Sequence, residues 1–92
     1  MRPYTIKIEK AATKGLKKLQ PAYHRSAIEF INGHLTETPL KPIPGKIKRL
    51  RGRYQGIYQY DLSRGDRIWW RVEPESHTVY VIYIGPHPKA TE

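Results

Sequence analysis

A row of basic and aromatic side chains in the second half of the chain is the feature best suited to chemistry. Arg67, Trp69 and Arg71 alternate there with the apolar residues Ile68, Trp70 and Val72. Residues two apart on a β-strand share a face, so the alternation predicts a strand with one apolar face and one basic face. Guanidinium groups bind phosphate oxygens, and an indole stacks on nucleobases. We therefore expect the basic face to suit a phosphodiester chain.

A basic segment precedes this strand. Six cations and no acidic residue occur from Lys41 to Arg53, and they are Lys41, Lys46, Lys48, Arg49, Arg51 and Arg53. Prolines and glycines stiffen residues 39–56, which we interpret as an extended connection. A solvated run of charge is the usual explanation for such a segment. Its lack of acidic neighbours favours phosphate binding instead, because each contact would release counterions.

Composition limits the classes of protein that the chain can represent. The 92 residues predict one domain, spanning 1–92, with a single modest core. A formal net charge of +9 favours a polyanionic partner such as nucleic acid, an anionic membrane or an acidic protein. The absence of cysteine excludes disulfides and thiolate metal sites. No apolar run approaches the length of about 20 residues that spans a bilayer, so we expect a soluble cytoplasmic protein without membrane association.

Periodicity changes twice along the first half of the chain. Tyr4, Ile6 and Ile8 alternate with polar residues and predict a short strand. A helical spacing follows, and Pro21 divides it into two helices because proline is suited to a first helical turn. The apolar stripes are Ala12, Leu16 and Leu19 in the first helix and Ala27, Phe30, Ile31, His34 and Leu35 in the second. The short link between them predicts a helical hairpin.

Three further strands are predicted at residues 57–62, 67–73 and 79–84. The intervening segments contain turn residues such as Gly65 and Pro74, so the strands should form an antiparallel meander. The expected fold class is therefore α+β with the order β-α-α-β-β-β. An antiparallel sheet would carry the helical hairpin on one face and leave the other face free for function.

Several motifs, taken in this order, resemble the RelE/ParE superfamily of bacterial type II toxins. They are Leu50-Arg51-Gly52, the strand Ile57-Tyr58-Gln59-Tyr60-Asp61-Leu62, the run Gly65-Asp66-Arg67, and Ile84-Gly85 before a tail with His87. The resemblance covers almost the whole chain. It implies either RelE-like cleavage of messenger RNA on the ribosome or ParE-like inhibition of DNA gyrase. In both branches a co-expressed antitoxin holds the toxin inactive.

The resemblance also implies roles for single residues. Arg67 matches an arginine that contacts the reacting phosphate, and His87 occupies the place of a C-terminal arginine or histidine that transfers a proton. RelE carries two lysines where this chain has Gln59 and Asp61. Asp61 is interpreted either as an ion-pair partner of Arg67 or Arg71, or as a general base. The tail tyrosine of many RelE-like nucleases is absent.

The favoured hypothesis is a type II toxin that cleaves messenger RNA as a ribosome-associated endoribonuclease, with no metal or cofactor. The residues expected to contact RNA are Lys48, Arg49, Arg51, Arg53, Gln59, Trp69, Arg71 and Lys89. Trp69 is expected to be exposed, to stack on a base or to be covered by the antitoxin. The expected partners are messenger RNA, the ribosome and an acidic antitoxin in a hetero-oligomer. Two alternatives stay open, a ParE-like gyrase inhibitor and a catalytically inactive binding module of the same fold.

Overall fold

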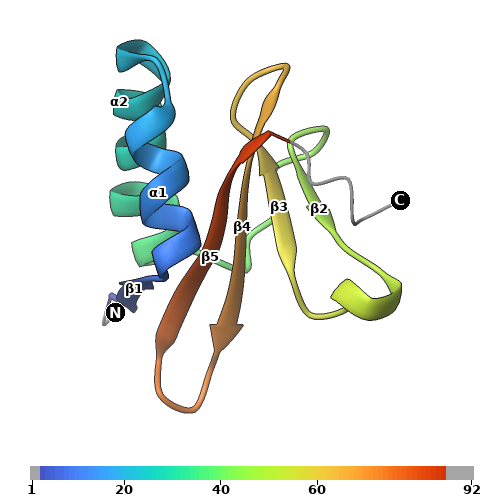
Figure 1. Cartoon of the computed structure of the whole chain (residues 1–92). Coiled ribbons are helices and arrows are strands. Elements are labelled where there is room, and N and C mark those ends of the chain that lie inside the picture. The colour runs from blue at the N-terminus through green and yellow to red at the C-terminus, as the bar shows by residue number, and fades with distance from the viewer. Residues whose placement is uncertain (1–2, 87–92) are drawn as a thin grey trace.

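The computed structural model describes residues 3–86 of the chain (Figure 1). The strands are β1 (Thr5–Ile8), β2 (Ile47–Arg49), β3 (Tyr58–Asp61), β4 (Asp66–Glu73) and β5 (Thr78–Pro86). The helices are α1 (Lys10–Lys18) and α2 (Pro21–Phe30), and α2 continues into a wider π-helical turn over Ile31–Leu35. The predicted α+β class and helical hairpin are therefore confirmed. None of the described helices is long and apolar enough to cross a membrane.

The sheet has one strand more than predicted, and its order is β1-β5-β4-β3-β2. The additional strand is β2, which the sequence indicated only as an extended basic connection. β2 forms because it pairs antiparallel with β3, an interaction that its own residues do not reveal. The predicted meander of β3, β4 and β5 is confirmed. The predicted antiparallel sheet is confirmed for β2, β3, β4 and β5, and β1 at the edge runs parallel to β5.

Both helices cover one face of the sheet, as Figure 1 shows. α1 packs most closely on β5, which lies between β1 and β4, and Gly15 allows the two backbones to approach each other there. A Cβ built on Gly15 would lie 1.5 Å from the carbonyl oxygen of Ile84. This contact fixes the distance between the helical layer and the sheet.

The core lies between the helices and the covered face of the sheet. Its members from the sheet include Ile68, Trp70, Val79, Val81 and Ile84, and the helical layer contributes Ala12, Ala27, Phe30, Ile31 and Leu35. Phe30 stacks on the Tyr60 ring with the ring centroids 3.9 Å apart. The buried Trp70 donates its indole N–H to the Pro39 carbonyl at 3.2 Å. Apolar packing on this face leaves Arg67, Trp69 and Arg71 on the other face, as the alternation predicted.

A β-bulge in β5 changes which residues face the core. Trp69 pairs with Tyr83 and Trp70 pairs with Val81, so Ile82 has no partner in β4. The extra residue moves Tyr83 to the face of Trp69, whereas a strict alternation from Val79 and Val81 would have placed it in the core. Tyr83 therefore belongs to the face without helices.

Candidate functional site

Arg67 is the centre of the polar arrangement on the face without helices. It lies near the start of β4, opposite Asp61 of β3 and Gly85 of β5. Its Nε is 3.1 Å from Asp61 Oδ1, in an ion pair that lacks the geometry of a hydrogen bond. The two side chains are 20% and 29% exposed, so solvent still reaches the pair. The ion-pair interpretation of Asp61 is confirmed, with Arg67 as the partner.

The turn between β3 and β4 holds the other side of the guanidinium. Arg67 Nη1 donates to the main-chain carbonyls of Ser63, Arg64 and Asp66 at 3.1, 3.4 and 3.2 Å. Ser63 stabilises this turn because its hydroxyl donates to Asp66 Oδ2 at 3.1 Å and accepts from the Asp66 amide at 3.1 Å. The turn between β3 and β4 therefore restricts the position of the Arg67 guanidinium.

A buried chain of hydrogen bonds connects Asp61 to the middle of the sheet. Gln59 donates through Nε2 to Asp61 Oδ1 at 3.2 Å and accepts from the Trp69 indole N–H at 2.9 Å. Gln59 is only 3% exposed, so both ends of its amide are committed to the fold. This arrangement makes Gln59 a positioning residue for Asp61, whereas the sequence predicted an RNA contact.

Trp69 is buried, and the expectation that it would be exposed is wrong. It retains 5% of its accessible surface. Its ring packs against Tyr54 and Tyr83, with centroids 5.1 and 5.6 Å apart. Tyr54, from the helical turn Gly52–Tyr54, and Tyr83, from β5, cover the indole. The sequence pattern of β4 alone does not indicate these neighbours. In this conformation Trp69 stabilises the face and offers no free surface for a nucleobase.

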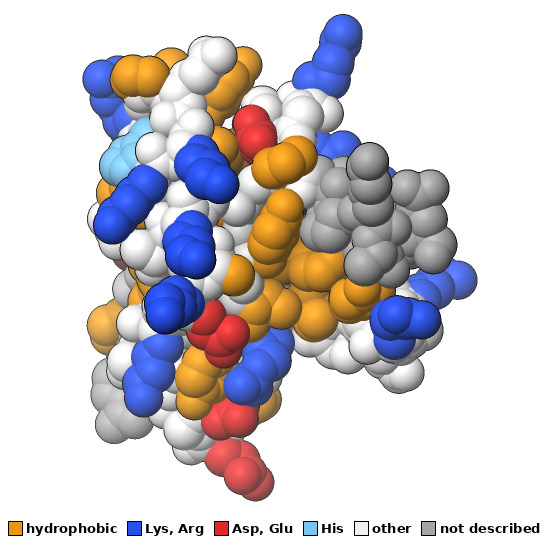
Figure 2. All heavy atoms as spheres, in the orientation of Figure 1, with side chains coloured by type: hydrophobic (Ala, Val, Ile, Leu, Met, Phe, Trp, Pro, Cys, Tyr) orange, Lys and Arg blue, Asp and Glu red, His pale blue; other side chains and the backbone are white. Residues whose placement is uncertain are grey.

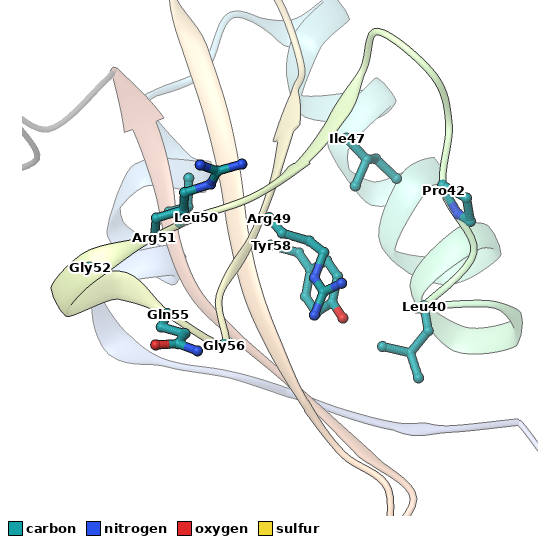
Figure 3. Close-up of a pocket in the computed structure, with 10 residues that line it drawn as sticks. All are labelled: Leu40, Pro42, Ile47, Arg49, Leu50, Arg51, Gly52, Gln55, Gly56 and Tyr58. Carbon is teal, nitrogen blue, oxygen red and sulfur yellow. The ribbon is translucent and has the colours of Figure 1, made fainter.

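The basic residues of β2 divide between the two faces of the sheet. Lys48 pairs with Gln59 and shares the face of Arg67, whereas Arg49 pairs with Tyr58 on the covered face. The Arg49 guanidinium lies 5.9 Å from the centroid of the Tyr58 ring. Figure 3 shows both in a hollow of about 840 Å³, which Arg51 also lines. The structure therefore does not bring the predicted RNA-binding residues onto one surface.

Arg71 and Arg53 lie apart from Arg67. Arg71 makes an ion pair with Glu73 at 3.2 Å and lies over the Tyr80 ring at 4.2 Å. Arg53 is exposed in a short helical turn, Gly52–Tyr54, after β2. The predicted site residues His87 and Lys89 lie outside the described residues.

Positive charge also extends over the helical layer. Figure 2 shows Lys and Arg side chains along this layer, where the exposed lysines of α1 are Lys10, Lys14, Lys17 and Lys18. The residues predicted from the sequence to bind RNA lie before β3, in β3, in β4 and in the tail, and none of them lies on α1. The net charge of +9 is therefore spread over both faces of the molecule and is not confined to the face of Arg67.

Tyr83 is a residue of this site that the sequence analysis missed. Burial raises the pKa of its hydroxyl above the ordinary value, and the Asp66 carboxylate adds to the effect. The hydroxyl therefore stays protonated at neutral pH, and it donates to the Pro86 carbonyl. The bulge at Ile82 brings Tyr83 to this face, and no local pattern announces a bulge there.

The sequence and the fold are similar to those of known toxins of toxin–antitoxin systems. No protein-family model matches the chain. The chain is 27% identical over 85 residues to the toxin RelG of Mycobacterium tuberculosis, covering 89% of this chain and 88% of RelG. A chain of the RelBE2 toxin–antitoxin complex of the same organism is 28% identical, with a TM-score of 0.77 and coverage of 95% of this chain and 94% of that one.

An archaeal RelE–RelB complex from Pyrococcus horikoshii shares the fold. The TM-score is 0.69 at 23% identity, and the alignment covers 94% of this chain and 97% of that one. The sequence relatives and the fold both support a type II toxin of the RelE/ParE superfamily.

Proposed function

We propose that this toxin is an endoribonuclease that cleaves messenger RNA at the ribosome. The observation that carries the proposal is the way Arg67 is held. An ion pair and three carbonyl contacts fix its guanidinium on the face of the sheet opposite α1 and α2. A fixed guanidinium stabilises charge that develops on a phosphate in the transition state and needs no reorganisation to do so.

The proposed reaction uses the RNA itself as the nucleophile. The ribose 2′-oxygen forms a bond to phosphorus, and the bond from phosphorus to the 5′-oxygen breaks. One proton leaves the 2′-hydroxyl and another reaches the departing 5′-oxygen, so positioned side chains are sufficient for the chemistry. Arg67 stabilises the negative charge of the pentavalent state, and His87 transfers a proton.

The proposed partner is an acidic antitoxin that forms a hetero-oligomer with the toxin in the cytoplasm. Charge complementarity supports this proposal, because a net charge of +9 favours association with an acidic protein. The solved relatives from Mycobacterium tuberculosis and Pyrococcus horikoshii are themselves toxin–antitoxin complexes. Such a partner would also stabilise the folded toxin by mass action.

The test is to express Arg67→Ala in a host and to map new 5′ ends in cellular RNA. Loss of one donor to a developing charge costs about 10²–10³-fold in rate, so codon-phased cuts should disappear. Lys17→Ala is a matched control because Lys17 is an exposed cation on α1. Cuts that persist in Arg67→Ala at equal expression would contradict the proposed role of Arg67.

A second candidate is a ParE-like gyrase inhibitor, and one observation favours it. Gln59 and Asp61, at the positions of the RelE lysines, are tied to Trp69 and Arg67 and have no lysine-like freedom. Intact RNA together with DNA breaks after expression would support this candidate. Harmless expression without an acidic partner encoded nearby would instead support an inactive binding module.

A further inference from the structure

A small hollow beside Arg67 combines three cations with one carboxylate. It has a volume of about 340 Å³ and lies where the segment entering β2 meets the turn between β3 and β4, at the upper end of the sheet in Figure 1. Its lining residues are Gly45, Lys46, Asp61, Ser63, Arg64 and Arg67. The excess of positive charge in this hollow suits an anion.

Arg67 enters this hollow with one nitrogen uncommitted. Nε lies against Asp61, and Nη1 donates to carbonyls of the turn. Within residues 3–86, all hydrogen bonds of the guanidinium are made by Nη1, so Nη2 has no hydrogen-bond partner there. A guanidinium that is held through two nitrogens and open at the third is preorganised to donate to a ligand, because the protein has already restricted its rotamers.

Lys46 and Arg64 are placed beside Arg67 by the backbone. The Lys46 carbonyl accepts from the Asp61 amide at 3.1 Å, which fixes Lys46 next to the ion pair. Gly45 has φ +78°, a left-handed conformation that favours glycine and that directs the chain into β2 at this point. Arg64 belongs to the turn that holds Nη1 of Arg67. Both side chains are exposed and lack an acidic partner among the described residues.

We propose that this hollow binds a phosphodiester group of the RNA through Arg67 Nη2, Lys46 Nζ and the Arg64 guanidinium. The assignment rests on the proposed ribonuclease function and adds Lys46 and Arg64 to the residues that contact RNA. Asp61 limits the excess positive charge, which suits the single negative charge of a phosphodiester. The turn that positions Arg67 thus also supplies a ligand for the RNA backbone.

The test measures the binding of the purified full chain to a labelled 2′-O-methyl RNA, which cannot be cleaved. Lys46→Glu and Arg64→Glu should each weaken binding about tenfold, the effect of losing one hydrogen bond to a charged group. Each should also reduce the slope of log K against log salt by about 0.7. Lys17→Glu, which makes the same charge change on α1, should alter the affinity less than about twofold.

Three outcomes are informative. Unchanged affinity in both variants would overturn the proposal, and Lys46→Gln and Arg64→Gln would repeat the test if the reversals unfold the chain. If inorganic phosphate binds in the hollow but neither variant changes the affinity for RNA, the hollow is an ion site without a role in RNA binding. If the variants weaken RNA binding but expressing cells keep intact RNA, the phosphate site stands and the proposed cleavage fails.

Discussion

At the scale of single residues, the ion pair with Asp61 is the contact that bears most directly on the role of Arg67. Asp61 Oδ1 accepts a hydrogen bond from the Gln59 amide and forms the ion pair with the Arg67 guanidinium. A carboxylate held in this way orients the arginine, and its negative charge also offsets part of the attraction of the guanidinium for an arriving phosphate. Positioning and general-base catalysis therefore give different expectations for a variant that keeps the shape of the side chain but removes its charge.

Asp61→Asn distinguishes the two roles. For a positioning residue we expect about a tenfold loss of cleavage rate from a less rigid Arg67, with the shape of the pH–rate profile unchanged. Loss of a general base would cost about 10²–10⁴-fold and would remove the acidic limb of the profile. Single-turnover cleavage on programmed ribosomes measures both quantities. Glu73→Gln is the matched control, since it removes the charge of a carboxylate in the surface ion pair with Arg71.

At the scale of elements, the contact between α1 and β5 is the tightest constraint in the fold. Any side chain on Gly15 would collide with the Ile84 carbonyl, which is backbone and cannot move independently. Helix propensity alone would favour alanine over glycine at this position. Packing between the layers therefore outweighs the local preference.

Two glycine substitutions test this constraint. Gly15→Ala should lower the free energy of unfolding by about 1–3 kcal/mol or more, as for an overpacked core. Gly33→Ala, in the π-helical turn with nothing within 4 Å of the added Cβ, should be neutral or stabilise by about 0.4–1 kcal/mol. Urea unfolding measures both. Equal stability of the two variants would show that α1 does not lie as closely on β5 as described.

The sequence predicts those helices and strands whose apolar residues recur with a clear helical or strand period. β4 and both helices carry clear apolar patterns, so their faces and approximate ends are predictable. β2 is three residues long and depends on its pairing with β3, so its own pattern does not reveal it. The parallel pairing of β1 with β5 joins segments distant in sequence, and no local pattern specifies such a register.

The candidate site is predictable to a similar extent. The alternation in β4 places Arg67 on the face opposite the helices, whereas the carbonyl contacts that hold Arg67 are seen only in the structure. The burial of Trp69 depends on Tyr54 and Tyr83, which arrive from a loop and from a bulged strand. Tertiary neighbours decide exposure, so the sequence predicts the face of a side chain better than its accessibility.

At the scale of the whole molecule, the two faces of β2 offer a test of where RNA lies. Lys48 and Arg49 are neighbours with the same charge, but only Lys48 shares the face of Arg67. RNA confined to that face would contact Lys48, whereas RNA contacting both residues would have to pass around the sheet edge formed by β2.

We expect Lys48→Glu to reduce the slope of log K against log salt by about 0.7, the value for one phosphate on a single strand. Arg49→Glu should leave the slope nearly unchanged. Titrations of labelled RNA at several salt concentrations provide the measurement. Equal effects of the two variants would show that the polyanion encloses the edge strand, and that Arg49 and Arg51 also contact the RNA as the sequence analysis predicted.

The position of β5 in the sheet has a consequence for folding during synthesis. β5 is synthesised after the other four strands, yet it lies between β1 and β4 and supports α1. Thr5 pairs with Thr78, so β1 cannot pair with β5 until Thr78 has been synthesised. At usual rates of synthesis this delay is on the order of seconds. Until then the helices lack the strand on which they pack, and Arg67 lacks Gly85 beside it. A chain that is still being synthesised therefore lacks the complete fold around Arg67 until β5 has been made.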